Sequence, residues 1–194
     1  MWPLIHIGRA QEFAESFKRY EDSDAATVDR ITEAIALAHT GQLDKARESL
    51  KLIGELQEAS QLREKLLLLH LAALLEDNAL CSRLASELQP LGTGLGFFDP
   101  ISIGRVLGEA AIVTGDIVGA RHSLSDALDV CQSARFRPEL ALVRLDLAEL
   151  LLEHYPDERE AAIEHLDFAI AEFREMKMQP SLERALRHRG LLKA

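Results

Sequence analysis

The stretch QPLGTGLGFFDP (residues 89–100) raises the first chemical possibility, a glycine loop that holds a phosphate. A P-loop needs G-x4-G-K-[ST], and a dinucleotide loop needs G-x-G-x-x-G directly after a strand. Here the glycines are spaced G-x-G-x-G, no lysine follows before Lys177, and Asp99 would repel an anion. The segment therefore predicts a flexible joint between two helical blocks, with Phe97 and Phe98 tucked into it.

Histidine, cysteine and serine raise the other chemical possibilities. A metal site needs three or four converging ligands, yet no HxxxH or HExxH pattern occurs, and His154 and His165 lie on either side of a predicted turn. Cys81 and Cys131 belong to no CxxC pair and are predicted to be buried, reduced thiols, and His70 is predicted to be a core histidine. No serine has a glycine-flanked nucleophile elbow. We therefore predict no catalytic residue, no metal site and no cofactor, and hence a protein that is not an enzyme.

Charge and hydropathy narrow the class of partner. The formal net charge is −10, divided evenly between the two halves, which argues against nucleic acid as the main partner. A basic run on the last predicted helix is typical of cations near a helix C-terminus. The alternative is a patch that docks an acidic partner or a nucleic acid. The run consists of Arg184, Arg187, His188 and Arg189. The longest apolar run (66–75) is too short for a bilayer span, and no signal peptide is visible. We expect a cytoplasmic protein without membrane contact.

The elements that would position these residues are helices. Apolar residues recur at helical spacing along almost the whole chain, and no alternating strand pattern occurs, so the fold class is predicted as all-α with about ten helices. Short connectors predict that consecutive helices are antiparallel neighbours, and three prolines (138, 156 and 180) fall where helices should begin. One helical stripe of apolar residues begins at Ala10 and is ended by the polar run 21–24, and the next begins at Val28 and is closed by Gly41. Further helices are predicted over residues 42–56, 60–76, 78–89, 100–114, 116–134, 138–154, 157–176 and 181–192.

Internal repeats favour stacked helix pairs over a compact bundle. The segments TGQLDKARESL (40–50) and TGDIVGARHSL (114–124) align without a gap at an offset of 74 residues, about twice a helical-repeat length of 34–40. Weaker copies are EDNALCSRL (76–84) and DEREAAIEHL (157–166). Each copy is predicted to begin the second helix of a pair. Three small residues, Ala46, Ala120 and Ala162, are predicted to be buried where paired helices cross.

Residues 104–124 resemble the tetratricopeptide repeat, with Gly104-x2-Leu107-Gly108-x2-Ala111 followed by Ala120-x3-Leu124. The resemblance implies antiparallel helix pairs stacked in a right-handed solenoid. Residues 78–194 also look like the C-terminal helical-repeat region of bacterial multidomain AAA/STAND-type signalling ATPases, which are linked to cyclase or helix-turn-helix domains. That likeness implies a regulatory protein–protein interaction module of a bacterial signalling protein, and a chain that is a fragment of a longer regulator.

The resemblance also places a partner groove, because the first helix of each tetratricopeptide pair lines the concave side. An amphipathic helix, from another protein or from a neighbouring domain of the parent chain, is its expected occupant. Two alternatives stay open: these residues are simply core, or the concave channel is a closed, polar-rimmed pocket that senses a small metabolite. The predicted groove residues are Ile31, Ile35, Lys65, Leu69, Arg105, Glu109, Ile112, Leu145 and Glu149.

We expect one continuous solenoid domain made of N-terminal repeats (1–89), the glycine-rich joint (90–98) and C-terminal tetratricopeptide-like repeats (99–194). Terminal repeats need a polar outer face, and the opening segment WPLIHI (2–7) is apolar. We therefore predict that this end packs either against a second copy, as a homodimer, or back onto the body of the same chain.

Overall fold

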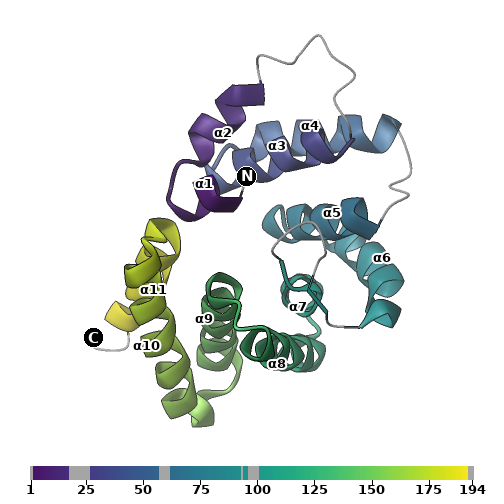
Figure 1. Cartoon of the computed structure of the whole chain (residues 1–194). Coiled ribbons are helices and arrows are strands. Elements are labelled where there is room, and N and C mark those ends of the chain that lie inside the picture. Colours follow the sequence, from purple (N-terminus) through teal and green to yellow (C-terminus); the bar gives the residue numbers. More distant parts are fainter. Residues whose placement is uncertain (1, 18–26, 57–61, 93, 96–100, 192–194) are drawn as a thin grey trace.

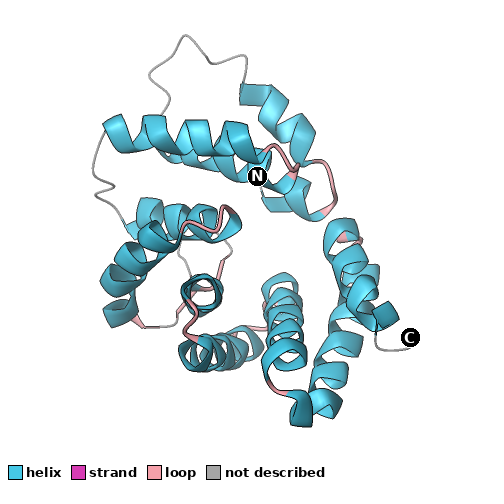
Figure 2. Cartoon of the chain, turned by 180° about the vertical axis from the view of Figure 1, so that it is seen from behind, coloured by secondary structure: helices cyan, strands magenta, loops and turns pink. Residues whose placement is uncertain are grey.

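The computed structural model describes residues 2–17, 27–56, 62–92, 94–95 and 101–191, and over these residues the fold is all-α, as predicted (Figures 1 and 2). Apart from one isolated bridge between Leu95 and Ser102, the described residues form no β-structure. The helices are α1 (Trp2–His6), α2 (Ala10–Phe17), α3 (Thr27–His39), α4 (Leu43–Leu56), α5 (Leu62–Leu74), α6 (Asn78–Leu88), α7 (Ile103–Thr114), α8 (Ile117–Ser133), α9 (Arg137–His154), α10 (Arg159–Met176) and α11 (Gln179–Leu191), with 3-10 turns at Gln89–Leu91 and Pro156–Glu158.

The helices follow one another around a closed curve. Most consecutive helices pack side by side, and α5 also contacts α3 and α7. At the end of the curve α11 comes back to α1, so the first and last helices meet (Figure 1). A Cβ atom added to Gly8, just after α1, would lie 3.6 Å from Cγ of Pro180 in α11. The apolar N-terminal end therefore packs back onto the body of the chain: Ile5 is buried, whereas Ile7 stays exposed.

The repeated segments coincide with the even-numbered helices, since α4, α6, α8 and α10 begin within them. The turns before α4, α6 and α8 have the same backbone form, since Gly41, Glu76 and Gly115 all adopt a positive φ. The predicted burial of the crossing alanines is confirmed, because all three have no exposed surface. The crossing of α7 with α8 is close, since a Cβ on Gly108 would lie 2.7 Å from Cγ of Leu124. Small residues thus set how near the paired helices lie.

The glycine segment joins helices that share one core. The first hydrophobic cluster runs from Ile5 to Ala110 and so contains residues on both sides of the segment. Two further clusters, over residues 120–150 and 141–185, continue the core. Helix α7 begins later than predicted, at Ile103, because Ser102 accepts the capping hydrogen bond from the backbone N–H of Arg105. The predicted cap at residues 99–100, and Phe97 and Phe98, lie outside the described residues.

Both cysteines are buried free thiols, as predicted. Burial raises the pKa of Cys81 and that of Cys131 to about 11, so both thiols stay protonated and unreactive at neutral pH. Among the helices of the described residues, none is long and apolar enough to cross a membrane.

Candidate functional site

Four of the nine predicted groove residues belong to the core. Ile31, Ile35, Leu69 and Leu145 have no exposed surface, so none of them contacts a partner in the folded chain. The physical reason is rotation about the helix axis: on an α-helix adjacent residues are about 100° apart, so a small error of register turns a core position into a groove position. On α5, for example, the residue aimed into the curve is His70, next to Leu69.

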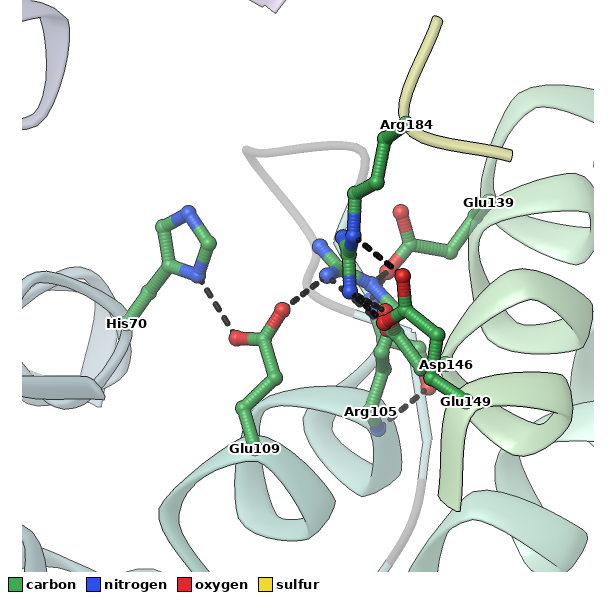
Figure 3. A network of polar contacts seen from close by, with 8 residues as sticks. His70, Arg105, Glu109, Glu139, Asp146, Glu149 and Arg184 are labelled. Atoms are coloured by element: carbon green, nitrogen blue, oxygen red, sulfur yellow. Dashed lines mark hydrogen bonds and ion pairs between the residues drawn. The ribbon is translucent and has the colours of Figure 1, made fainter. Parts of the chain in front are cut away.

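The other five predicted residues lie in three different places. Ile112 is half-buried and packs against the second half of the core. Lys65 forms an ion pair with Glu87 of α6. Arg105, Glu109 and Glu149 come together inside the curve, in what we call the inner network (Figure 3). Its members are His70, Ser102, Arg105, Glu109, Glu139, Asp146, Glu149, Arg184 and His188.

Arg105 of α7 is the centre of the inner network, and its guanidinium group is buried. Its Nε donates a hydrogen bond of 2.7 Å to Oε1 of Glu139. The same oxygen accepts a second hydrogen bond of 2.7 Å from the backbone N–H of Ser102. On its own helix Arg105 donates to Glu109, whose other oxygen lies 2.8 Å from Nδ1 of His70. One buried cation thereby connects α5, α7 and α9.

A second arginine connects the last helix to the same place. Arg184 of α11 donates to Oδ1 of Asp146 at 2.9 Å and makes a two-point contact with Glu149, both acids lying on α9. His188, one turn further along α11, has Nε2 2.8 Å from Oε1 of Glu149. Arg184 and His188 of the basic run therefore hold α11 against α9, and Arg189 pairs with Asp167 of α10, with Nε 2.9 Å from Oδ1. Arg187 is exposed.

Burial and charge shift the pKa values in this network in opposite directions. Although burial alone would raise it, the pKa of Glu109 falls to about 2 because Arg105 and His70 favour its charged form. Burial raises the pKa of Asp146 to about 6 against the pull of Arg184 and Arg105. Its Oδ2 is buried without a hydrogen bond and lies 3.6 Å from Nη1 of Arg105. Asp146 is thus the least satisfied carboxylate of the network.

The inner network connects helices and contains no nucleophile held by a base. Its carboxylates accept hydrogen bonds from arginine, histidine or backbone donors. Such buried ion pairs fix the positions of the helices relative to one another, although removing the charged groups from water is unfavourable. Sequence reasoning missed Glu139 and Asp146, and it gave Arg184 only the role of a helix-end cation or part of a docking patch. The available signal was the spacing of acids at residues 139, 146 and 149, which places carboxylates on one stripe of an otherwise apolar helix.

Histidines gather at the same inner side without forming a metal centre. The rings of His39 and His70 have centroids 5.9 Å apart. Burial, Arg105 and His70 lower the pKa of His6 to about 4. Over the described ranges, no group of three or more histidine, cysteine or acidic side chains is arranged to hold a metal ion.

A separate feature is a groove of about 880 Å³ bounded by α4, α5 and α6, called here the α4–α6 groove. Lys65, the predicted groove residue on α5, lies in its wall. The apolar part of the lining is Leu50, Ile53, Leu68, Leu75, Ala79, Leu80 and Leu84, and the charged part is Arg47, Lys51, Lys65, Asp77, Arg83 and Glu87.

The packing of α4 explains why this groove exists. Each of α6 and α8 packs extensively against the odd-numbered helix before it and the one after it. Over the described residues, α4 packs extensively only against α3. The face of α4 that would meet the next pair is therefore left open.

The chain matches no protein-family model and no curated protein.

Proposed function

We propose that this chain is a non-catalytic helical-repeat module that binds a helical segment of a partner protein in the α4–α6 groove. In this proposal it is the regulatory part of a bacterial signalling protein and works in the cytoplasm. The observation that supports it is the groove itself, which has an apolar floor, a charged rim and walls formed by helices. Amphipathic helices bind in grooves of this kind.

The inner network has a supporting role in this proposal. It connects α5, α7, α9 and α11 through buried ion pairs, which keeps the curve of helices in one shape. A frame held in this way fixes α5 and α7, the two helices against which α6 packs, so the α5–α6 side of the groove needs less ordering when a partner binds.

A small-ligand sensor is the second candidate, and one observation favours it. The groove volume of about 880 Å³ lies within the size range of pockets that bind small molecules. The two candidates share the same groove and differ in the occupant, so one blocking variant serves for both.

The test uses fluorescent peptides designed as amphipathic helices with a constant leucine face and acidic, neutral or basic flanks. Fluorescence anisotropy should detect binding of at least one charge class. Ala79→Trp should abolish it, because Ala79 is an exposed groove residue whose enlargement fills the space without removing core. Ala171→Trp on α10 is the matched control, since Ala171 is an exposed helical alanine outside the groove, and it should bind as the parent does.

The interaction proposal is wrong if no peptide binds, or if every peptide that binds the parent binds Ala79→Trp equally well. A metabolite that raises the melting temperature of the parent and of Ala171→Trp, but not of Ala79→Trp, would then establish the sensor.

A further inference from the structure

The charge of the α4–α6 groove identifies the class of partner, and this inference rests on the proposed function. We infer that the groove selects an acidic amphipathic helix of about three turns. Among the described residues the groove is lined by four basic side chains and two acidic ones, on a chain whose net charge is −10. A basic groove on an acidic protein is a local reversal of charge, and such reversals steer and select partners.

The two acids do little to neutralise the rim. Glu87 is engaged by Lys65, with Nζ 2.6 Å from its Oε2. Asp77 caps α6, where its carboxylate accepts the backbone N–H of Leu80 at 3.0 Å. Each acid therefore has a partner inside the fold, and the positive charges elsewhere on the rim remain.

Three cations remain available, and they lie on opposite walls. Arg47 and Lys51 are one helical turn apart on α4, while Arg83 lies on α6. In the described part of the chain no ion pair of Lys51 or Arg83 is formed, although Lys65 and, beside it, the charge of Arg83 lower the pKa of Glu87. Arg47 has only a 3.5 Å contact to the fully exposed Asp44. A helix lying between the walls would meet positive charge on both of its edges. Acidic residues flanking an apolar stripe match that arrangement.

The length of the walls sets the length of the occupant. Helix α6 lines the groove from Ala79 at one end to Glu87 at the other. At 1.5 Å per residue this stretch is about 13 Å, or roughly two and a half helical turns, so an occupant of about three turns covers it. The occupant would lie against α4 on the face that has no extensive packing partner, so the apolar stripe of the partner would cover Leu50 and Leu80, the partly exposed leucines of the groove. The other leucines of the lining, and Ile53, already belong to the core.

The experiment compares three peptides that differ only at the flanking positions, with glutamate, glutamine or lysine, each labelled with fluorescein. We expect the glutamate peptide to bind the full chain most tightly and the lysine peptide most weakly. The preference should shrink when sodium chloride is raised from low to high concentration, because exposed charges are screened.

Charge reversal then tests the named residues. The double variant Lys51→Glu, Arg83→Glu should weaken the glutamate peptide by roughly tenfold or more and should strengthen the lysine peptide. The matched control is Lys45→Glu, Arg187→Glu, which makes the same change in net charge at exposed positions outside the groove. It should leave the order of the three peptides unchanged.

The failures of the two proposals are distinguishable. If the glutamine or lysine peptide binds as well as the glutamate peptide, and Ala79→Trp removes that binding, the acidic preference is wrong while the interaction module stands. If the control double variant weakens the glutamate peptide as much as the groove variant does, the attraction comes from overall charge, and the inference is overturned. If no peptide binds in a way that Ala79→Trp removes, both fail.

Discussion

At the scale of single residues, the most unusual feature is a buried guanidinium group surrounded by carboxylates. Arg105 is 4% exposed, and Glu139 and Asp146, which face it, are similarly buried. Such a cluster is costly to desolvate and becomes unstable when one partner is removed, because the remaining charges stay buried without compensation. The inner network therefore predicts large effects from small changes.

We predict that Arg105→Met lowers the free energy of unfolding by about 3–5 kcal/mol, because it leaves buried carboxylates without a cation. The matched control is Arg137→Met, which removes an exposed arginine paired with Glu172 and Glu175. It should change the free energy of unfolding little, because exposed ion pairs are screened by water. Urea denaturation measures both, and equal losses in the two variants would contradict a structural role for the inner network.

The two carboxylates with opposite pKa shifts predict opposite pH dependence. The pKa of Asp146 is raised to about 6 by burial, in a site faced by Arg184, Arg105, Glu109 and Glu149. Between pH 6 and pH 4 the folded state therefore holds a proton that the unfolded state has lost. The slope of stability with pH is negative in that window, and this residue makes the protein more stable as the pH falls. Relative to Asp146→Asn, the parent should gain stability from pH 7 to pH 4.

Glu109 provides the converse case. Its folded pKa of about 2 lies below the ordinary glutamate value, so its stabilising contribution is complete above about pH 5 and is lost as the pH falls toward 2. Relative to Glu109→Gln, the parent should lose stability over pH 5 to 3. Denaturation series at closely spaced pH values test both differences. A difference of the same sign for both variants would show that the two sites do not titrate as described.

At the scale of helices, the fold depends on close crossings and on tight turns between paired helices. Gly104 and Gly108 of α7 face the small-residue side of α8, and a Cβ at either position would meet atoms of the neighbour at 2.9 Å or less. The turns reverse the chain with a single left-handed residue at the end of a helix, for which glycine is the favoured type.

We predict that Ala120→Leu destabilises the protein by about 1–3 kcal/mol, because Ala120 is fully buried at the α7–α8 crossing and its enlargement overpacks the contact. Val118→Leu, at an exposed position of the same helix, is the control and should change stability little. Thermal unfolding measures the effect. An unchanged melting temperature for Ala120→Leu would contradict the alignment of the repeats.

The turn between α5 and α6 offers a stabilising change. Glu76 adopts φ +56° at the position where the equivalent turns have Gly41 and Gly115. We predict that Glu76→Gly raises the free energy of unfolding by up to about 1 kcal/mol, since the strain of a left-handed glutamate exceeds the added entropy of the unfolded chain. Gly115→Ala should lower it by a similar amount. A destabilised Glu76→Gly would mean that the turn is not strained.

At the scale of the whole molecule, the contact between the first and last helices closes the curve. Helix α1 reaches α11, and Ile5 is buried while Ile7 is 41% exposed. Substituting each isoleucine in turn therefore distinguishes two effects, loss of the contact that closes the curve and loss of hydrophobicity in general. Both residues lie in the same short segment, but only Ile5 is buried.

We predict that Ile5→Asp detaches α1 and opens the curve, because the carboxylate would be buried without a partner. Amide hydrogen exchange should then rise in residues 2–6 and at the start of α11, and the radius of gyration from small-angle scattering should increase. Ile7→Asp should leave both measurements unchanged. Unchanged exchange in Ile5→Asp would show that α1 is not docked in solution.

The amino-acid sequence by itself determined the fold class and nearly every helix. Periodicity and turn residues act over a few neighbouring positions, so Gly41, Gly115 and the prolines at 138 and 180 are readable without knowledge of the rest of the chain. The burial of Ala46, Ala120 and Ala162 was also readable, because a repeated small residue at a fixed place in the repeat indicates a close crossing.

Only the tertiary structure decided which side of each helix faces inward. Helices α5 and α9 are apolar around most of their circumference, so periodicity does not distinguish Leu69 from His70 or Leu145 from Asp146. Which residue faces the core depends on where the neighbouring helices lie, and that is a property of the whole arrangement. The meeting of Arg184 with α9, the open face of α4 and the return of α1 to α11 all join residues distant in sequence, and local pattern contains no information about such contacts.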